Sequence, residues 1–250
     1  MISSTVYVEN MAQEFWTLAG GLPDYPCDIE NVITFTLPLE VIPIPELRVH
    51  DIQEWTSRAM TAHDIRGRDR RLHGCLLADR GEGVIFYDAD DLLDEQRITL
   101  AHELAHFLVD YQAPRERAMS IFGPSILPVL DGERLATDVE RLHAVLSTVH
   151  LGRMSHIMER PDEGLPSNAV LDIEERADRL ALELLAPAAL LCTQMQQTTV
   201  HGFKERLAFL TQQLITIHAL PDYIASSYAR YVLHQMGEPT FRDLLFRYTE

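Results

Sequence analysis

Hydrophobic residues recur at helical spacing along most of this chain of 250 residues. Residues 8–19 carry an apolar set that includes Met11, Phe15 and Trp16, which predicts a helix ending at the Gly-Gly-Leu-Pro sequence of residues 20–23. Similar patterns predict helices over residues 28–36, 49–62, 135–149, 172–185, 203–215 and 221–236. The sequence has no internal repeat and no low-complexity segment. Because the predicted helices cover much of the chain, we expect a mostly helical protein.

Strand signals lie between residues 39 and 87. Residues 39–44 are rich in Val, Ile and Leu, and two prolines at positions 43 and 45 place this strand at a sheet edge. Residues 73–78 and 83–87 are short apolar runs joined by Asp-Arg-Gly-Glu, which suits a hairpin. We therefore predict an α+β fold, mostly helical, with a small antiparallel sheet packed on the helix that follows it.

That following helix carries a zincin-like pattern of polar residues. Residues 99–106 read TLAHELAH and contain H-E-x-x-H, inside a run that is otherwise nearly all apolar. Because residues four apart share one helix face, His102 and His106 can present two imidazoles to one cation. Glu103 can then act as general base on water activated by that cation. Asp90, Asp91 and Asp94 are candidate caps for this helix.

A catalytic zinc site needs a third protein ligand. The extended pattern H-E-x-x-H-x-x-G-x-x-H is excluded, because Val109 and Gln112 stand where Gly and His are required. The other solution is a glutamate from a second helix, where Glu174 and Asp178 are four residues apart. Glu174 would be the ligand and Asp178 would hydrogen-bond the far nitrogen of a ligand histidine; the alternative for Glu174 is a solvated helix face.

Both motifs together resemble the ImmA/IrrE family of metallopeptidases. Residues 99–106 match its H-E-x-x-H motif, and residues 174–187, EERADRLALELLAP, resemble its second motif, E-x-x-A-[N/D] followed by a small apolar run. The resemblance extends over roughly residues 39–187 and implies that Glu174 is the third ligand. Two departures are Ala186 where Met is usual and a spacer of 67 residues between His106 and Glu174.

The resemblance implies a zinc-dependent endopeptidase, with Mn²⁺ as an alternative metal, that cleaves a regulatory protein such as a transcriptional repressor. We expect a metallopeptidase domain over residues 1–187 with a helical insertion at about 112–170. Residues 188–250 form a helical C-terminal region with a helix-turn-helix outline. The alternative is a metal-stabilised regulatory or DNA-binding protein without proteolytic activity.

Charge, hydropathy and cysteine content indicate which classes of partner and which cellular location to expect. The formal net charge of −17 makes direct binding to nucleic acid unfavourable without a basic patch. No apolar run approaches the length of a membrane span, and residues 1–20 lack a secretion signal. Three widely spaced cysteines indicate reduced thiols. We therefore expect a cytoplasmic protein with a protein substrate and no membrane partner; the sequence does not predict its oligomeric state.

Four further features of the sequence support secondary predictions. The histidines of the insertion, His143, His150 and His156, are candidate donors to an oxyanion, although a surface position is the commoner outcome. The arginine-rich residues 64–71 predict a solvated loop. Residues 161–168 have the composition of a lid over the cleft. An edge strand near residues 84–87 is a candidate for holding substrate by strand addition.

Overall fold

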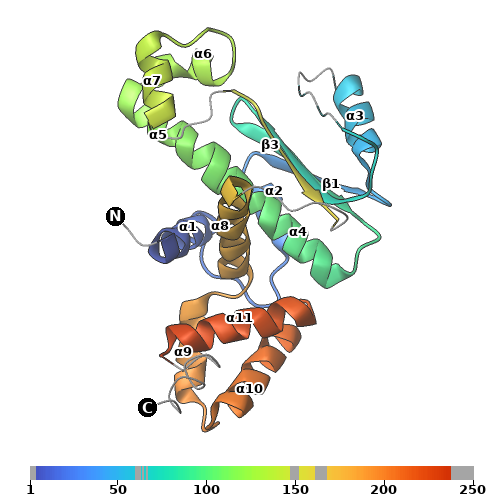
Figure 1. Ribbon diagram of the computed structural model, residues 1–250, viewed down its shortest axis with the longest axis vertical. Coiled ribbons are helices and arrows are strands. Elements are labelled where there is room, and N and C mark those ends of the chain that lie inside the picture. The colour runs from blue at the N-terminus through green and yellow to red at the C-terminus, as the bar shows by residue number, and fades with distance from the viewer. Residues whose placement is uncertain are drawn as a thin grey trace.

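The structure is a computed structural model that describes residues 4–59, 63, 65, 67–146, 152–160 and 168–237. The helices are α1 (Ser4–Leu18), α2 (Ile29–Thr36), α3 (Val49–Arg58), α4 (Leu93–His106), α5 (Ala113–Phe122), α6 (Leu127–Leu130), α7 (Asp138–Leu146), α8 (Asn168–Leu185), α9 (Ala188–Gln197), α10 (Phe203–Thr216) and α11 (Asp222–Gln235), with a π-helix η1 (Phe107–Gln112) and a 3-10 turn η2 (Pro124–Ile126). The strands are β1 (Leu39–Ile44), β2 (Leu72–Asp79), β3 (Glu82–Asp88) and β4 (Met154–Glu159). The predicted α+β fold class is confirmed (Figure 1).

The four strands form one sheet in the order β1-β3-β2-β4. β2 and β3 make the expected hairpin, with Gly74 opposite Tyr87. Its turn has positive φ at Arg80 (53°) and Gly81 (88°), as a tight hairpin turn requires. β4 pairs antiparallel with β2 on the other side. β1 lies at one edge of the sheet, as its prolines predicted.

Three expectations about this sheet are corrected. The sheet is mixed rather than antiparallel, because β1 pairs parallel with β3. The segment 112–170 is not wholly helical, since it contains β4. Finally, residues 84–87 do not form an edge: they lie in β3, which pairs with β1 on one side and β2 on the other. Among the described strands, the unpaired sides are those of β4 and β1.

Alternation along the strands divides the sheet into two apolar faces. Cys75, Leu77 and Phe86 point to α3, where they pack with Val49 and Ile52. Leu76, Ala78, Ile85 and Tyr87 point to the opposite side and join the main core with α4 and α8. In β4, Ile157 belongs to the α3 side and Met154 to the α4 side. His156 and Met158 share the parity of Met154, so β4 turns these side chains toward α4.

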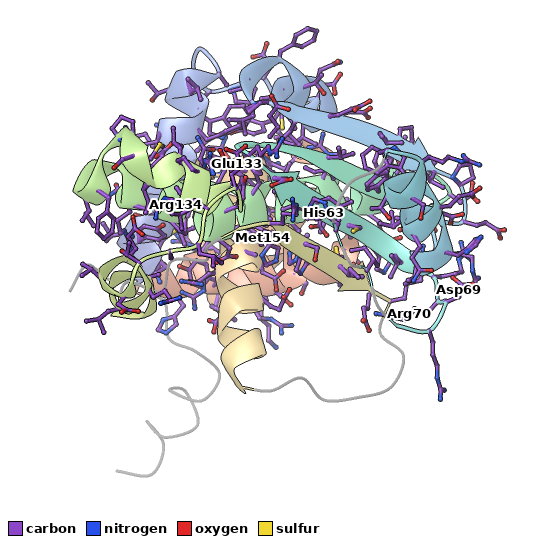
Figure 2. All side chains as sticks on the ribbon, turned by 90° about the horizontal axis from the view of Figure 1, so that it is seen from above. His63, Asp69, Arg70, Glu133, Arg134 and Met154 are labelled. Atoms are coloured by element: carbon purple, nitrogen blue, oxygen red, sulfur yellow. The ribbon has the colours of Figure 1, made fainter. Side chains whose placement is uncertain are left out.

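The end of β4 is fixed by charged residues. Arg70 pairs with Glu159, and Arg160 binds Asp88 at 2.7 Å and Asp91 at 2.6 Å. Figure 2 labels Arg70 at this end of the sheet and Met154 at the start of β4. The arginine-rich loop is therefore not merely solvated, because part of it holds the end of β4.

α4 lies between the sheet and α8. None of its candidate caps is the N-cap: Leu92 occupies that position without a side-chain hydrogen bond, and Asp94 lies in the first turn. From Thr99 to His106 every residue of α4 is buried, and the helix continues as η1 with wider turns. The motif residues therefore lie in the interior between two layers.

The C-terminal helices share the main core. Leu210 and Leu214 of α10 and Ala225, Val232 and Leu233 of α11 belong to the same buried cluster as α4 and α8. Figure 1 shows α9, α10 and α11 grouped at one end of the molecule, away from the sheet. No helix in the described ranges has the length and apolar character to cross a membrane.

Several predictions cannot be compared with the structure. The predicted lid at residues 161–168 lies outside the described residues except for its last residue, and so does His150. The predicted domain boundaries stay predictions.

Candidate metal centre

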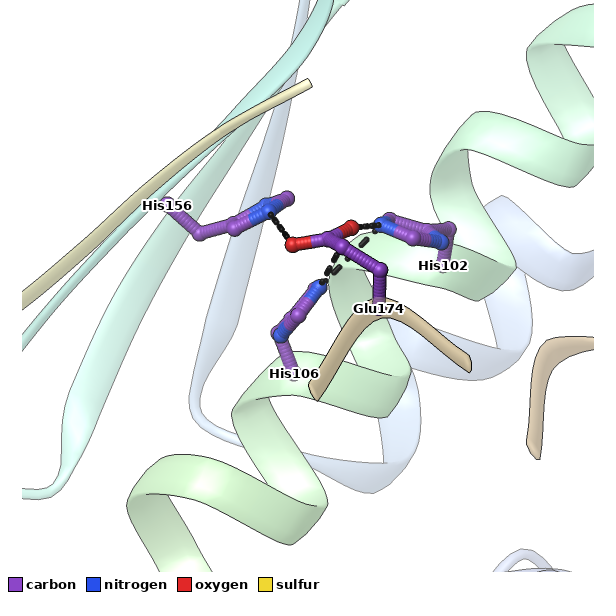
Figure 3. A group of neighbouring side chains, drawn as sticks. All are labelled: His102, His106, His156 and Glu174. Atoms are coloured by element: carbon purple, nitrogen blue, oxygen red, sulfur yellow. Dashed lines mark hydrogen bonds and ion pairs between the residues drawn. The ribbon is translucent and has the colours of Figure 1, made fainter. Parts of the chain in front are cut away.

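Four side chains from three elements converge beside α4. His102 and His106 come from α4, Glu174 from α8 and His156 from β4 (Figure 3). One ligand atom from each lies within 4.8 Å of all the others. Both α4 histidines are buried, and Glu174 is half-buried. The sequence-predicted trio of His102, His106 and Glu174 is thus brought together with a third imidazole, that of His156, which the sequence offered only as a candidate oxyanion donor.

Three of these donor atoms form a triangle of suitable size for a metal ion. The Nε2 atoms of His102 and His106 are 3.1 Å apart, and Glu174 Oε2 lies 3.2 Å from the first and 3.7 Å from the second. Tetrahedral zinc with ligands at about 2.0–2.1 Å separates neighbouring donors by about 3.3 Å. The three predicted ligands therefore fit one face of such a tetrahedron.

The outer nitrogens of both imidazoles contact carboxylates. His102 Nδ1 lies 2.9 Å from Asp178 Oδ1, and His106 Nδ1 lies 2.8 Å from Asp110 Oδ2. Carboxylates accept hydrogen bonds, so both Nδ1 atoms carry hydrogens, and the two Nε2 atoms face each other and Glu174. A cation bound between them would take a lone pair from each Nε2 atom in place of a proton. The donor set consequently fits a divalent metal.

Asp178 lies where the sequence placed it, whereas Asp110 was missed. Asp110 is four residues after His106 and reaches it from the π-helical turn η1. Arg176, within the second motif, holds the other oxygen of Asp110 at 3.2 Å. Residues four apart share a helix face. The spacing of Asp110 from His106 could therefore have predicted their contact.

Glu103 is fully buried beside the cluster. Its Oε2 lies 2.9 Å from Nδ1 of His156, while its Oε1 has no hydrogen-bond partner among the described residues. Burial disfavours the charge of Glu103, but His156 and the other imidazoles outweigh it and lower the pKa of this carboxyl. An ionised carboxylate with one free oxygen next to the donors can accept a proton from water.

His156 lies between Glu103 and Glu174. Its Nε2 is 3.2 Å from Glu174 Oε1, and its ring stacks on His106 with centroids 3.7 Å apart. No motif marks His156 in the sequence; only the pairing of β4 with β2 brings it here. The side chain of His143 is outside the described residues, so His156 is the insertion histidine whose placement bears on the site.

The carboxylates stabilise positive charge across the cluster. Burial opposes protonation of His102, but hydrogen bonds with Asp178 and Glu174 raise its pKa to about 9. Burial likewise opposes protonation of His156, but Glu103 and Glu174 raise its pKa to about 10. Hydrogen bonds from the three imidazoles lower the pKa of Glu174. A field that favours protons at these nitrogens also favours a bound cation.

One family model matches the part of the chain that carries the α4 motif. Residues 55–124 match the sequence model of the IrrE N-terminal-like domain, Peptidase_M78. The match includes β2, β3 and the H-E-x-x-H helix, and ends before His156 and Glu174. A search of curated proteins gives no match. The resemblance to ImmA/IrrE peptidases is thereby confirmed, and the match and the donor cluster together support a metallopeptidase of this kind.

Proposed function

We propose that this chain is a zinc-dependent endopeptidase that cleaves a regulatory protein, with a transcriptional repressor as the expected substrate. The observation that carries the proposal is the buried Glu103 carboxylate beside three donor atoms spaced for a metal ion. His102, His106 and Glu174 would hold the ion. We expect zinc, with Mn²⁺ as the alternative, and a cytoplasmic location in keeping with three free cysteines.

Held by His102, His106 and Glu174, a divalent ion would act as a Lewis acid toward the scissile carbonyl and water. Glu103 takes the proton of the attacking water on Oε1 and delivers it to the leaving amine. His156 donates from Nδ1 to Oε2 of Glu103, which holds the carboxylate beside the metal donors. Asp178 and Asp110 fix the rotation of the two ligand imidazoles.

The substrate would bind along β4. This strand pairs with β2 on one side, and its other side has no strand partner within the described ranges. An extended peptide can add to such an edge through backbone hydrogen bonds. Because β4 also carries His156, a peptide on this edge passes the metal donors.

The experiment combines metal content with cleavage. The purified protein should hold about one zinc per chain, His102→Ala should lose it, and Glu103→Gln should keep it. When a peptide mixture made from a digested proteome is incubated with the zinc-loaded protein, new termini should appear. Glu103→Gln should lower their rate of formation by about 10²–10⁴-fold. Equal rates with Glu103→Gln would overturn the role of this carboxylate.

One observation favours a second candidate, a metal-stabilised regulator that does not cleave. His156 is close enough to complete a set of four protein ligands, and structural zinc sites are closed in this way. Such a protein would bind zinc tightly, would lose zinc in His156→Ala and would form no new termini. An endopeptidase retains zinc in His156→Ala, because three ligands remain.

A DNA-binding role receives less support. α10 and α11 are consecutive helices, but Arg230 is the sole arginine or lysine of α11 and much of α11 packs in the core. The formal net charge of −17 adds general repulsion from a duplex.

A further inference from the structure

A cavity of about 480 Å³ opens next to the metal donors. Most of its walls come from α8 and α11. α4 and β4 contribute one residue each, Ile98 and Met158, and α1 contributes Val8 and Glu9. We propose that this cavity receives a large apolar side chain of the substrate, from a residue adjoining the scissile bond. This inference rests on the proposed peptidase function and adds a substrate preference to it.

The cavity borders the same elements that carry the metal donors, one turn of α4 and α8 and two residues of β4 away from them. Asp178 lines it and also contacts His102 at 2.9 Å. Asp178 follows Glu174 by one helical turn, an advance of about 5–6 Å. On the opposite wall, Met158 follows His156 by two residues of β4, about 6–7 Å along the strand. Both walls thus lead from donor residues to the cavity over the spacing of one or two residues of an extended peptide.

The lining chemistry suits an apolar side chain. Most of the wall is aliphatic or aromatic, with Ala181 and Leu182 from α8 and Ile224, Tyr228 and Tyr231 from α11. Its volume lies within the range of about 300–1,000 Å³ found for ligand pockets, so it can hold a Phe, Leu or Met side chain. Removal of such a side chain from water provides the binding free energy.

Two charged groups of the wall, Glu183 and Arg179, already have partners. The two oxygens of Glu183 accept hydrogen bonds from Ala188 N–H and the Tyr228 hydroxyl, both at 3.1 Å. Arg179 pairs with Glu175 at 2.6 Å and lies over the ring of Tyr231. A free ligand needs polar groups to fix its orientation. A side chain attached to a peptide held on β4 does not, which favours the substrate as occupant.

The test compares cleavage preferences of two tryptophan variants. Ser227 is an exposed residue of α11 that lines the cavity, so Ser227→Trp adds bulk there at little risk to folding. Gln235 is an exposed residue of the same helix outside the lining, and Gln235→Trp is the matched control. Each zinc-loaded protein is incubated with the peptide mixture made from a digested proteome, and the residues flanking the new termini are counted.

We expect the wild type to favour Phe, Leu, Met or Tyr at one position beside the cleaved bond by at least about tenfold over Ala, as burial of several methylene groups implies. Ser227→Trp should reduce that preference at least about fivefold while Gln235→Trp retains it. Cleavage without an apolar preference, or a preference unchanged in Ser227→Trp, overturns the inference and leaves the peptidase function standing. No cleavage of any peptide by the zinc-loaded wild type overturns the peptidase function itself.

Binding provides a second readout that does not depend on turnover. The preferred peptide, labelled with fluorescein, is titrated with Glu103→Gln and compared with the same peptide carrying Ala at the preferred position. The Ala peptide should bind at least about tenfold more weakly, and Ser227→Trp in the Glu103→Gln background should abolish this difference. Equal binding of the two peptides contradicts the inference. A dye control gives a further contradicting outcome. If Ser227→Trp abolishes binding of 1-anilinonaphthalene-8-sulfonate but saturating peptide leaves the dye bound, the cavity is a separate ligand site and the inference fails.

Discussion

Asp110 lies 2.8 Å from Nδ1 of His106, one turn further along the same helix. The contact fixes the ring so that Nε2 points at His102 and Glu174, and Arg176 holds the carboxylate from α8. We predict that Asp110→Asn lowers zinc affinity by about 10–100-fold, as loss of a carboxylate behind a ligand histidine typically does. Competition with a chromophoric chelator measures this change. Asp24→Asn, at an exposed loop position, is the control and should bind zinc like the wild type.

Gly74 of β2 provides the space for Glu103. A Cβ atom at position 74 would lie 2.5 Å from Thr99 Cγ2 and 3.3 Å from Glu103 Oε1. Gly74→Ala should therefore destabilise the protein by about 1–3 kcal/mol through overpacking and displace the general base. Zinc content should stay near one per chain while cleavage falls. Gly74→Ala combined with Thr99→Ser, which removes the nearest methyl group, should recover part of the stability; no recovery would mean that the clash lies elsewhere.

Glu183 predicts a pH dependence of stability outside the metal centre. Burial raises its pKa from 4.5 to about 7, although hydrogen bonds from Ala188 and Tyr228 oppose the rise. A raised folded-state pKa gives stability that is complete below about pH 4.5 and is lost as pH rises to about 7. Glu183→Gln should thus gain stability relative to the wild type between pH 5 and pH 8, by up to about 3 kcal/mol.

The hydrogen-bond geometry around Glu183 supports the protonated form. The Tyr228 hydroxyl has one hydrogen, yet it contacts both Glu183 Oε1 and the Ala186 carbonyl, at 3.1 and 2.9 Å. The hydroxyl can donate to only one of these two acceptors at a time, so it stabilises the ionised Glu183 carboxylate incompletely. Urea unfolding at pH 5 and pH 8 measures the effect. Glu14→Gln, on the exposed face of α1, should show no such pH-dependent gain; an equal gain in both variants would indicate a general charge effect.

Arg160 holds the end of the strand that carries His156. Arg160 binds the fully buried Asp88 at 2.7 Å. When Arg160 is removed, the charged partner that remains for Asp88 is Arg71, at 3.2 Å. Arg160→Gln should lower the free energy of unfolding in urea by about 1–3 kcal/mol, because a buried carboxylate loses a charged partner. Arg141→Gln breaks an exposed pair with Asp138 and should cost no more than about 0.5 kcal/mol. Equal effects of the two would remove the special role of Arg160.

Local patterns predicted the elements that hold most of the proposed ligands. The i, i+4 spacing of His102 and His106 and that of Glu174 and Asp178 depend on helix geometry alone. The hairpin of β2 and β3 follows from its turn residues. These features need no information about distant parts of the chain, so they could be predicted from the sequence.

Pairing across long stretches of sequence could not be predicted in the same way. β4 is a six-residue strand within a segment of helical pattern, and its partner β2 lies about 80 residues earlier. From the sequence, His156 is therefore only one of three candidate oxyanion donors, and a surface position is the commoner outcome. The parallel pairing of β1 with β3 is also set by packing of α3 and α4 on the two sheet faces rather than by local sequence.

The late position of β4 in the chain has a consequence for folding. The β2–β3 hairpin and α4 lie within residues 72–106, so they form through local contacts, whereas docking of β4 and α8 must close loops of about 60 residues or more. A partly folded chain can thus present both α4 histidines and Glu103 while it lacks Glu174 and His156. Peptide-bond cleavage would begin only when the last strand and helix have docked, which protects a nascent chain and its neighbours from premature hydrolysis.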